Sequence, residues 1–214
     1  MKSLYDLTAH PSLQQFPWED TFVGLASAHK SVTTFYGDVH STQYQHTAKG
    51  WKDKNSWRWY NALKHGVQVE GFNVNVTGFI GDWWWARMHE ANVWQRTGNA
   101  EHFGALFDWL RICGMFESTG RILFFLQLKG AGSPQHTDFD PSAVPVHLRE
   151  PTEFLWLTPP DNPKQLTVDG QEAPYACWFN HFLPHGSAAA DRPQWSLRVD
   201  GKFTPSFRAS LEQQ

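Results

Sequence analysis

The part of the chain after Gly120 constrains the fold most. It consists of short β-rich runs separated by clusters of Gly, Pro, Asp and Asn. The runs are RILFFLQL, VHLREPTEFLWLT, LTVDGQEAP, YACWFNHFL and WSLRVDGKF. Several short strands at close spacing, with turn residues between them, are typical of antiparallel barrels and jelly rolls. We therefore predict an α+β, mainly β fold with a jelly-roll core in residues 120–207.

Residues 1–119 have a different character. VQVEGFNVNVTGFI, from Val67 to Ile80, alternates apolar and polar residues as a strand does, with a break at Gly71. WWWARMHEANVWQ, from Trp83 to Gln95, has no Gly or Pro and predicts a helix. We expect this part to pack helices on the core and to form a lid over it, within one domain of residues 1–214.

A second helix is predicted after Asn99, whose side chain suits an N-cap. Apolar residues then recur at steps of three and four, which is the spacing of one buried helix face. They are Phe103, Leu106, Phe107, Leu110 and Cys113. We expect this face to pack on a sheet.

Composition excludes several classes of protein. The 214 residues allow one domain with a sizeable core, and an aromatic content of 15% excludes a disordered chain. The 18 Lys and Arg are spread along the chain against 21 Asp and Glu, so we expect no nucleic-acid partner. No apolar stretch has the length of a signal peptide or a membrane span, which predicts a cytoplasmic protein without a membrane partner. The sequence leaves the oligomeric state open.

Histidine supplies the candidate chemistry. Among 11 histidines, only His136 is followed two positions later by an acidic residue, Asp138. The spacing alone means little, because acidic residues are common enough to produce it by chance. On an extended strand, however, both side chains lie on one face and can bind one cation. With His185 as a third ligand, two imidazoles and a carboxylate leave one face of an iron ion open.

Three segments between Gly120 and Phe203 carry a family pattern. They are GRILFFLQLKGAGSPQHTDFD, VHLREPTEF and YACWFNHFLPHGSAAADRPQWSLRVDGKF. Together they resemble the Fe(II)/2-oxoglutarate-dependent oxygenases, whose double-stranded β-helix carries a His-x-Asp pair, a distal His and a later Arg. Within that superfamily the short core is most similar to the aspartyl/asparaginyl hydroxylase-like branch, which includes hydroxylases of free amino acids.

The resemblance implies a role for each matching residue. His136, Asp138 and His185 would bind Fe(II). Arg198 would bind the distal carboxylate of 2-oxoglutarate, for which a forked guanidinium is well suited. Ser196 lies on the same strand face as Arg198 and would donate a hydrogen bond to that carboxylate.

Further residues and alternatives remain open. The resemblance also places basic groups in the co-substrate pocket, and the candidates are Arg121, His147 and Arg149. His181 is the alternative to His185 as the distal ligand. Arg192 is the alternative to Arg198, although it precedes Pro193 in a predicted turn.

The implied reaction is hydroxylation of an unactivated C–H bond, with O₂ as oxidant and 2-oxoglutarate converted to succinate and CO₂. A carboxylate at Asp138 favours hydroxylation, because halogenating relatives carry a small residue there. We expect a small-molecule substrate, such as a free amino acid or a related carboxylate. Two alternatives are a hydroxylase of protein or peptide side chains, and a cupin-like binding module without catalysis.

Overall fold

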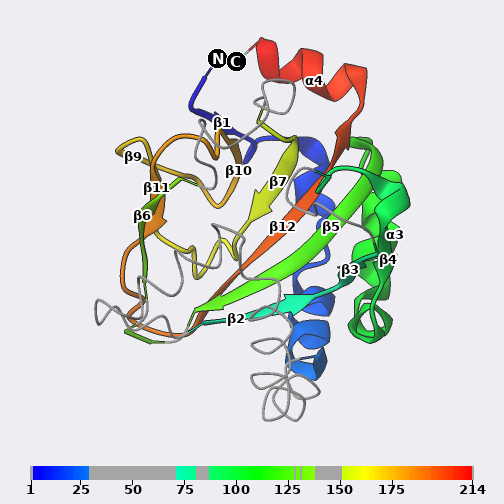
Figure 1. Cartoon of the computed structure of the whole chain (residues 1–214), viewed down its shortest axis with the longest axis horizontal. Helices are drawn as coiled ribbons and strands as arrows, with labels where there is room; N and C mark the ends of the chain where they lie inside the picture. The colour runs from blue at the N-terminus through cyan, green and yellow to red at the C-terminus, as the bar shows by residue number, and fades with distance from the viewer. Residues whose placement is uncertain are drawn as a thin grey trace.

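The computed structural model describes residues 2–28, 71–80, 87–127, 129–130, 132–137 and 151–213. Two antiparallel sheets dominate it, and helices lie against the larger sheet (Figure 1). The predicted mainly β fold is confirmed in this coarse form. Within these ranges, no helix is both long and apolar enough to cross a membrane.

The larger sheet has six strands. In spatial order they are β1 (Leu4–Asp6), β10 (Ala176–Phe179), β7 (Phe154–Leu157), β12 (Gln194–Phe203), β5 (Phe116–Gln127) and β2 (Gly71–Asn75). Every neighbouring pair is antiparallel. Two of the strands, β1 and β2, come from residues 1–119, so this part of the chain extends the sheet at both edges as well as supplying helices.

The smaller sheet has four strands. In spatial order they are β6 (Ser133–His136), β11 (His185–Ser187), β8 (Leu166–Val168) and β9 (Gln171–Glu172). From β5 to β12 the chain passes alternately between the two sheets, with β8 and β9 joined as a hairpin. Asp169 and Gly170 form that hairpin's turn with φ of 50° and 77°, as expected for an Asp-Gly type I′ turn.

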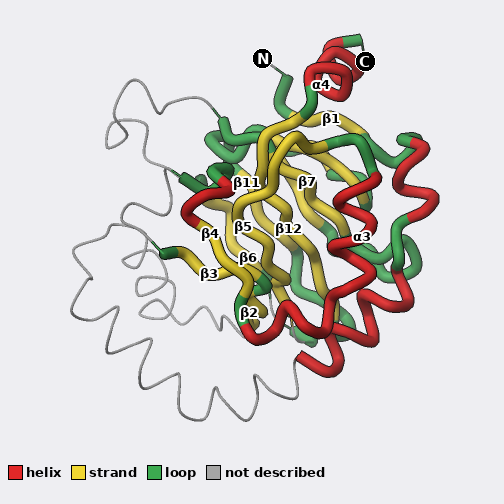
Figure 2. The backbone as a smooth tube through the Cα atoms, turned by 90° about the vertical axis from the view of Figure 1, so that its right-hand side faces the viewer, coloured by secondary structure: helices red, strands yellow, loops and turns green. Residues whose placement is uncertain are grey.

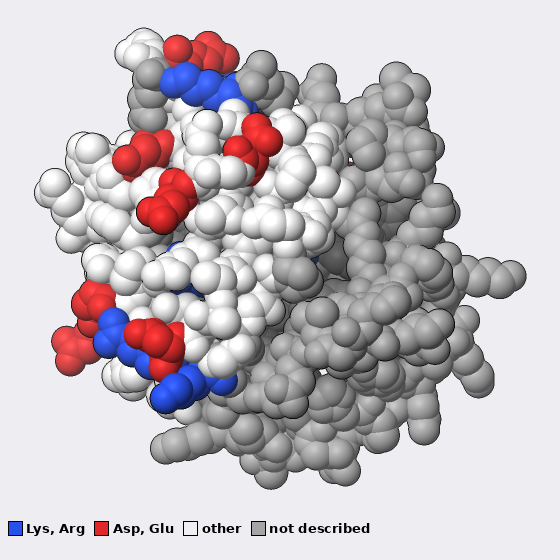
Figure 3. Space-filling view, turned by 90° about the vertical axis from the view of Figure 1, so that its left-hand side faces the viewer, with Lys and Arg blue, Asp and Glu red and all other residues white. Residues whose placement is uncertain are grey.

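Figure 3 views the side of the molecule on which the smaller sheet lies. Acidic and basic side chains are scattered over the described surface of this side in small separate groups. Uncharged residues fill the area between them.

A third sheet corrects two sequence predictions. It pairs β3 (Thr77–Phe79) with β4 (Trp94–Arg96), and a 3₁₀ turn, η3 (Ala91–Val93), precedes β4. The helix predicted over 83–95 is therefore wrong in its described part, because pairing with β3 and the packing of Trp94 on Phe79, 5.2 Å between ring centroids, outweigh helix propensity. The predicted strand over 67–80 is present in its described part, with an interruption at Val76, and the predicted break at Gly71 stays a prediction because residues 67–70 lie outside the described ranges.

Helices cover one face of the six-stranded sheet (Figure 2). They are η1 (Pro11–Gln15), a helix over 18–28, η4 (Gly98–Phe103) and α3 (Gly104–Ile112). The predicted apolar face of α3 is buried, except that Phe107 is half-buried beneath Arg96. Asn99 is not the N-cap of α3, because its side-chain amide donates to the carbonyl of Asn75 and the first turn is 3₁₀.

The helix layer is tied to the sheet by aromatic packing. Phe103 stacks on Phe124 of β5 with ring centroids 4.8 Å apart, and Trp109 packs edge-on against Phe16 at 4.9 Å. The Trp109 indole N–H also donates to the carbonyl of Ser12. The C-terminal helix α4 (Pro205–Glu212) is capped by Thr204, whose hydroxyl accepts from the amide of Phe207.

Alternation along β12 separates the two faces of the sheet. Trp195, Leu197 and Val199 belong to the buried apolar core. The residues between them, Ser196, Arg198 and Asp200, are also buried but polar, and period-two geometry places them on the opposite face. This second face carries the candidate site.

Candidate functional site

Two of the predicted metal ligands meet across the smaller sheet. His136 is the last residue of β6 and His185 the first of β11, and the two are directly opposite in the antiparallel register. Their imidazole centroids are 4.5 Å apart. Residues opposite each other in such a pair project to the same side of the sheet, so one cation can reach both rings.

A backbone hydrogen bond fixes the orientation of His185. Its Nδ1 lies 2.9 Å from the carbonyl oxygen of Leu183, which can only accept, so Nδ1 carries the proton. Nε2 is then the nitrogen available to bind a metal. A histidine ligand held by a backbone carbonyl behind it is the usual arrangement at protein metal sites. The imidazole pair therefore fits a divalent metal of the Fe(II) type.

The remaining metal ligand lies outside the described residues. Asp138 is two positions beyond the end of β6, and the co-substrate candidates His147 and Arg149 also fall in the range 138–150 that is not described. In the described ranges, no three His, Cys, Asp or Glu side chains are grouped closely enough to hold a metal ion. The structure thus brings together two of the three predicted ligands and leaves the third as a prediction.

A buried charge cluster lies on the inner face of β12. The Arg198 guanidinium is 2.9 Å from Oδ1 of Asp200, and Nε of Arg121 donates to Oδ2 of the same carboxylate at 2.8 Å. Arg198 is 4% exposed and Asp200 is fully buried. Buried guanidinium groups of this kind are well suited to bind an anionic ligand.

Aromatic rings connect the charge cluster to the imidazole pair. The Arg198 guanidinium stacks 3.9 Å above the Phe154 ring. Phe154 contacts Phe179 at 4.9 Å between centroids, and Phe179 contacts the His185 ring at 5.1 Å. The two polar groups are therefore connected through the Phe154 and Phe179 rings.

Ser196 lies on the same face of β12, two residues before Arg198. It is fully buried, and its hydroxyl has no hydrogen-bond partner among the described residues. An unsatisfied buried hydroxyl costs about 1–3 kcal/mol. The position therefore favours a ligand that can accept a hydrogen bond, which fits the role implied for Ser196 at a carboxylate.

The structure also places the two alternative residues. His181 is fully buried, and its ring lies 5.9 Å from that of Phe154. The pairing partner of His136 is His185. Arg192 lies in the loop before β12, where its guanidinium donates to the side chain of Asn162 and the carbonyl of Asp161.

Two residues near the site were not selected from the sequence. Asp200 binds both arginines, and its position two residues after Arg198 on one strand face was the available signal. Lys164 places its ammonium 5.4 Å from the Trp156 ring and 6.0 Å from the Phe125 ring. A lysine in a Pro-rich loop gave no sequence signal, because its direction depends on the loop's contacts.

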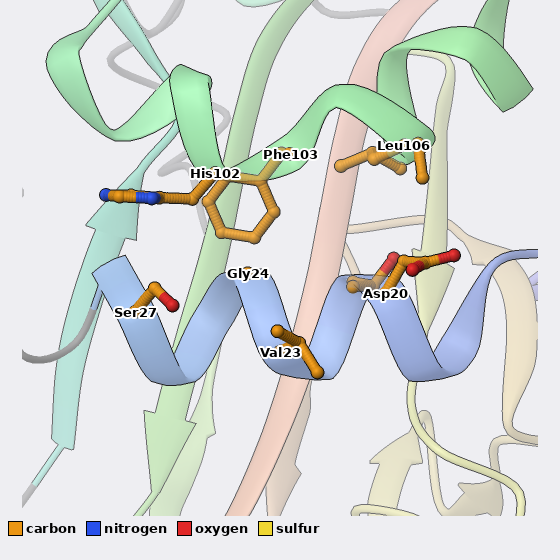
Figure 4. Close-up of a pocket in the computed structure, with 9 residues that line it drawn as sticks. Asp20, Val23, Gly24, Ser27, His102, Phe103 and Leu106 are labelled. Atoms are coloured by element: carbon orange, nitrogen blue, oxygen red, sulfur yellow. The ribbon is translucent and has the colours of Figure 1, made fainter.

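The crevice drawn in Figure 4 lies elsewhere. It has a volume of about 230 Å³ and runs between the 18–28 helix and the segment from His102 to Leu106. The helix approaches closely at Gly24, where a Cβ would collide with the carbonyl oxygen of His102. The crevice belongs to the helix layer, on the side of the sheet opposite to the imidazole pair, and we assign it no function.

Comparison with known proteins gives a partial likeness. No protein-family profile matches the chain, and no curated protein does. A Pseudomonas putida prolyl-4-hydroxylase is 19% identical with a TM-score of 0.31, and the match covers 50% of this chain and 64% of that one. A Burkholderia pseudomallei oxidoreductase of the 2OG-Fe(II) oxygenase family is 10% identical with a TM-score of 0.37, covering 67% and 75%.

A third structure is a viral collagen prolyl hydroxylase from Paramecium bursaria Chlorella virus 1. It is 10% identical with a TM-score of 0.36, and the match covers 66% of this chain and 85% of that one. None of the three TM-scores reaches 0.5.

Proposed function

We propose that this protein is a non-haem Fe(II)- and 2-oxoglutarate-dependent oxygenase that hydroxylates a small molecule. The imidazole pair is the main support for this proposal. His136 and His185 are 49 residues apart in sequence, and the fold brings their ring centroids within 4.5 Å of each other. Asp138 would complete the ligand set. When bound, the ferrous ion supplies the activation of O₂ that no protein side chain can provide.

The protein's own contribution at the metal is orientation. The carbonyl of Leu183 holds the proton on Nδ1 of His185 and so aims Nε2 away from the backbone. The ladder between β6 and β11 fixes the spacing of the two rings. Because both rings come from paired strands, the geometry is set before a ligand arrives, and little reorganisation is needed on binding.

The charge cluster supports binding of the dicarboxylate co-substrate. Arg198 presents a buried guanidinium on the interior face, and Asp200 keeps it extended along that face. Arg121 binds the other oxygen of the same carboxylate. Ser196 supplies a hydroxyl on the same face. We propose that these groups bind the distal carboxylate of 2-oxoglutarate.

The strand order supports a jelly roll of the double-stranded β-helix type. Apart from the β8–β9 hairpin, successive strands from β5 to β12 alternate between the two sheets, which is how such a fold encloses an interior. That alternation brings the ends of β6 and β11 over the interior face of β12. We also propose that this chain belongs to the aspartyl/asparaginyl hydroxylase-like branch.

The proposed small-molecule substrate fits the walls of the interior. The rings of Phe125, Phe154, Trp156 and Phe179 surround a small number of polar groups. Mostly apolar walls with a few placed polar groups are typical of sites for small molecules. We propose a free amino acid or a related carboxylate as the substrate.

The test is succinate formation. Anaerobically purified protein is loaded with Fe(II), supplied with 2-oxoglutarate and O₂, and assayed with a panel of free amino acids and with Asp- or Asn-containing peptides. We expect succinate to form in step with a hydroxylated amino acid. Succinate coupled to peptide hydroxylation would reassign the substrate class. Metal and ligand binding without any succinate would replace the oxygenase by a cupin-like binding module.

A further inference from the structure

A second group of unsatisfied donors lies at the deep end of the interior face. Three buried polar atoms there have no hydrogen-bond partner among the described residues, namely Nε1 of Trp156, Oγ1 of Thr158 and Oγ of Ser196. Trp156 is the register partner of Arg198, and continuing that register by two residues places Thr158 opposite Ser196. All three therefore lie on one face at adjoining positions.

The ammonium of Lys164 lies close to this group of unsatisfied donors. It lies over the rings of Trp156 and Phe125, and Phe125 is the register partner of Ser196 on β5. Among the described residues no carboxylate pairs with it. Burial lowers the pKa of Lys164 to about 8, as expected for an ammonium held against apolar surface without a counter-ion.

The loop that carries Lys164 is anchored to the start of β12. Asn162 donates from its side chain to the carbonyl of Pro193 and accepts from the Arg192 guanidinium, and Gln194 donates to the carbonyl of Pro163. These contacts flank Lys164 on its N-terminal side, and the amide of Leu166 donates to its carbonyl on the other. The direction of the lysine is thus set by the fold. Arg192 acts as a positioning residue for this loop.

The chemistry of the set selects an anion. An indole N–H and an ammonium can only donate hydrogen bonds, and the two hydroxyls can donate as well. A carboxylate is the acceptor that satisfies such a set and also neutralises the lysine. The Phe179 ring lies 6.0 Å from Trp156 and 5.1 Å from His185, so one phenyl ring separates this deep end from the imidazole pair.

We propose that Lys164, with Trp156, Thr158 and Ser196, forms the deep wall of the co-substrate pocket and binds the distal carboxylate of the 2-oxo diacid as a second cation beside Arg198. This inference rests on the proposed function. Arg198 already shares Asp200 with Arg121, whereas Lys164 brings a charge that no described acidic residue offsets. The pocket thereby selects a five-carbon diacid over a 2-oxo acid that ends in a methyl group.

The test compares two ligands on Mn(II)-loaded protein, so that binding is measured without turnover. Calorimetry gives the Kd of 2-oxoglutarate and of 2-oxopentanoate, which lacks the distal carboxylate. We expect Lys164→Met to raise the Kd of 2-oxoglutarate by at least about 30-fold, the usual effect of removing one partner of a buried charge pair. The affinities for 2-oxopentanoate and for Mn(II) should stay unchanged. Lys164→Gln, which keeps a polar side chain, serves if the Met variant does not fold.

The matched control is Lys202→Met. Lys202 is 59% exposed and pairs with Glu117 on the surface, so its loss should leave both affinities unchanged. Equal 2-oxoglutarate affinity in the wild-type protein and both Lys164 variants would overturn this inference and leave the oxygenase proposal standing. Failure of the wild-type protein to bind Mn(II) or 2-oxoglutarate would overturn the proposed function instead.

Discussion

His136 and His185 lie directly opposite each other on two antiparallel strands, with their imidazole centroids 4.5 Å apart. Neither strand is long, since β6 has four residues and β11 three. The pair is nevertheless held on both sides, because β11 also pairs with β8, where Val168 is the partner of His185. Strand pairing on both sides thus fixes the positions of the two imidazoles, as the proposed metal site requires.

Replacing His185 by Ala should remove metal binding. We expect the affinity for Fe(II) or Mn(II) to fall by at least about 100-fold, because even loss of a group behind a metal ligand costs about 10–100-fold. Isothermal titration of the metal-free protein measures this. His102→Ala is the control, since His102 lies in the helix layer and, within the described ranges, its one acidic contact is the exposed Glu101. Equal metal affinity in the two variants would remove His185 from the ligand set.

Replacing Asp200 by Asn should destabilise the fold. The change leaves the buried guanidinium of Arg198 and that of Arg121 without their shared counter-ion, and breaking a buried ion pair costs about 3–5 kcal/mol. Denaturant unfolding of the variant gives the free energy directly. Glu117→Gln breaks the exposed pair with Lys202 and should cost less than about 1 kcal/mol. Similar losses in both variants would show that the buried cluster contributes no more than a surface pair.

The sequence predicted the β-rich second half well, and local pattern explains why. The runs after Gly120 have strand composition and turn residues between them, and β7, β8, β9 and β10 lie within those runs. Two longer strands overlap the runs but begin before them, β5 at Phe116 and β12 at Gln194. The prediction is wrong over 83–95, where the absence of Gly and Pro favours a helix. The described part of that segment instead pairs with β3 through Trp94–Arg96, a contact with residues far along the chain.

The candidate site was predictable only in part. The His-x-Asp spacing and the family pattern indicated His136, His185 and Arg198, because they are local or motif-based signals. The interaction of Arg121 with Asp200 joins residues 79 positions apart and depends on the register between β5 and β12. The direction of the Lys164 side chain depends on the contacts of its loop with Arg192 and Gln194. Such contacts leave no periodic pattern in the sequence.

Replacing Ser196 by Ala should change stability and binding in opposite directions. The variant removes a buried hydroxyl that has no partner among the described residues, so the free energy of unfolding of the ligand-free protein should rise by about 1 kcal/mol. The affinity for 2-oxoglutarate should fall, because the carboxylate loses a donor. Unfolding curves and calorimetry test the two parts. A loss of stability with unchanged affinity would indicate a purely structural hydroxyl.

The stability of the ligand-free protein should depend on the protonation of Lys164. Burial lowers the pKa of Lys164 from 10.5 to about 8. Between these values the unfolded chain binds a proton that the folded protein does not, so the contribution of Lys164 to the free energy of unfolding rises with pH and is constant below about pH 8. The free energy of unfolding of the wild type relative to that of Lys164→Met should therefore be lowest and constant below about pH 8, where the buried ammonium is charged, and should rise from about pH 8 to about pH 10.5. A constant difference would place the lysine in solvent.

Replacing Phe124 by Ala should weaken the packing of the helix layer on the six-stranded sheet. Phe124 is fully buried and stacks on Phe103, so its truncation should cost about 3–5 kcal/mol. Phe124→Leu keeps most of the volume and should cost less. Phe22, which is 58% exposed, is the matched control, and its Ala variant should lie within about 0.5 kcal/mol of wild type. Equal costs at both positions would contradict the packing described.

The most direct test of the metal centre is anomalous diffraction. Crystals grown with Mn(II) and 2-oxoglutarate, and measured at the metal's absorption edge, locate the ion independently of any assumed ligand. The account predicts a peak about 2.1 Å from Nε2 of both His136 and His185, with a carboxylate of Asp138 as the third protein ligand. A bound metal ion elsewhere, with no peak between the two imidazoles, would contradict it.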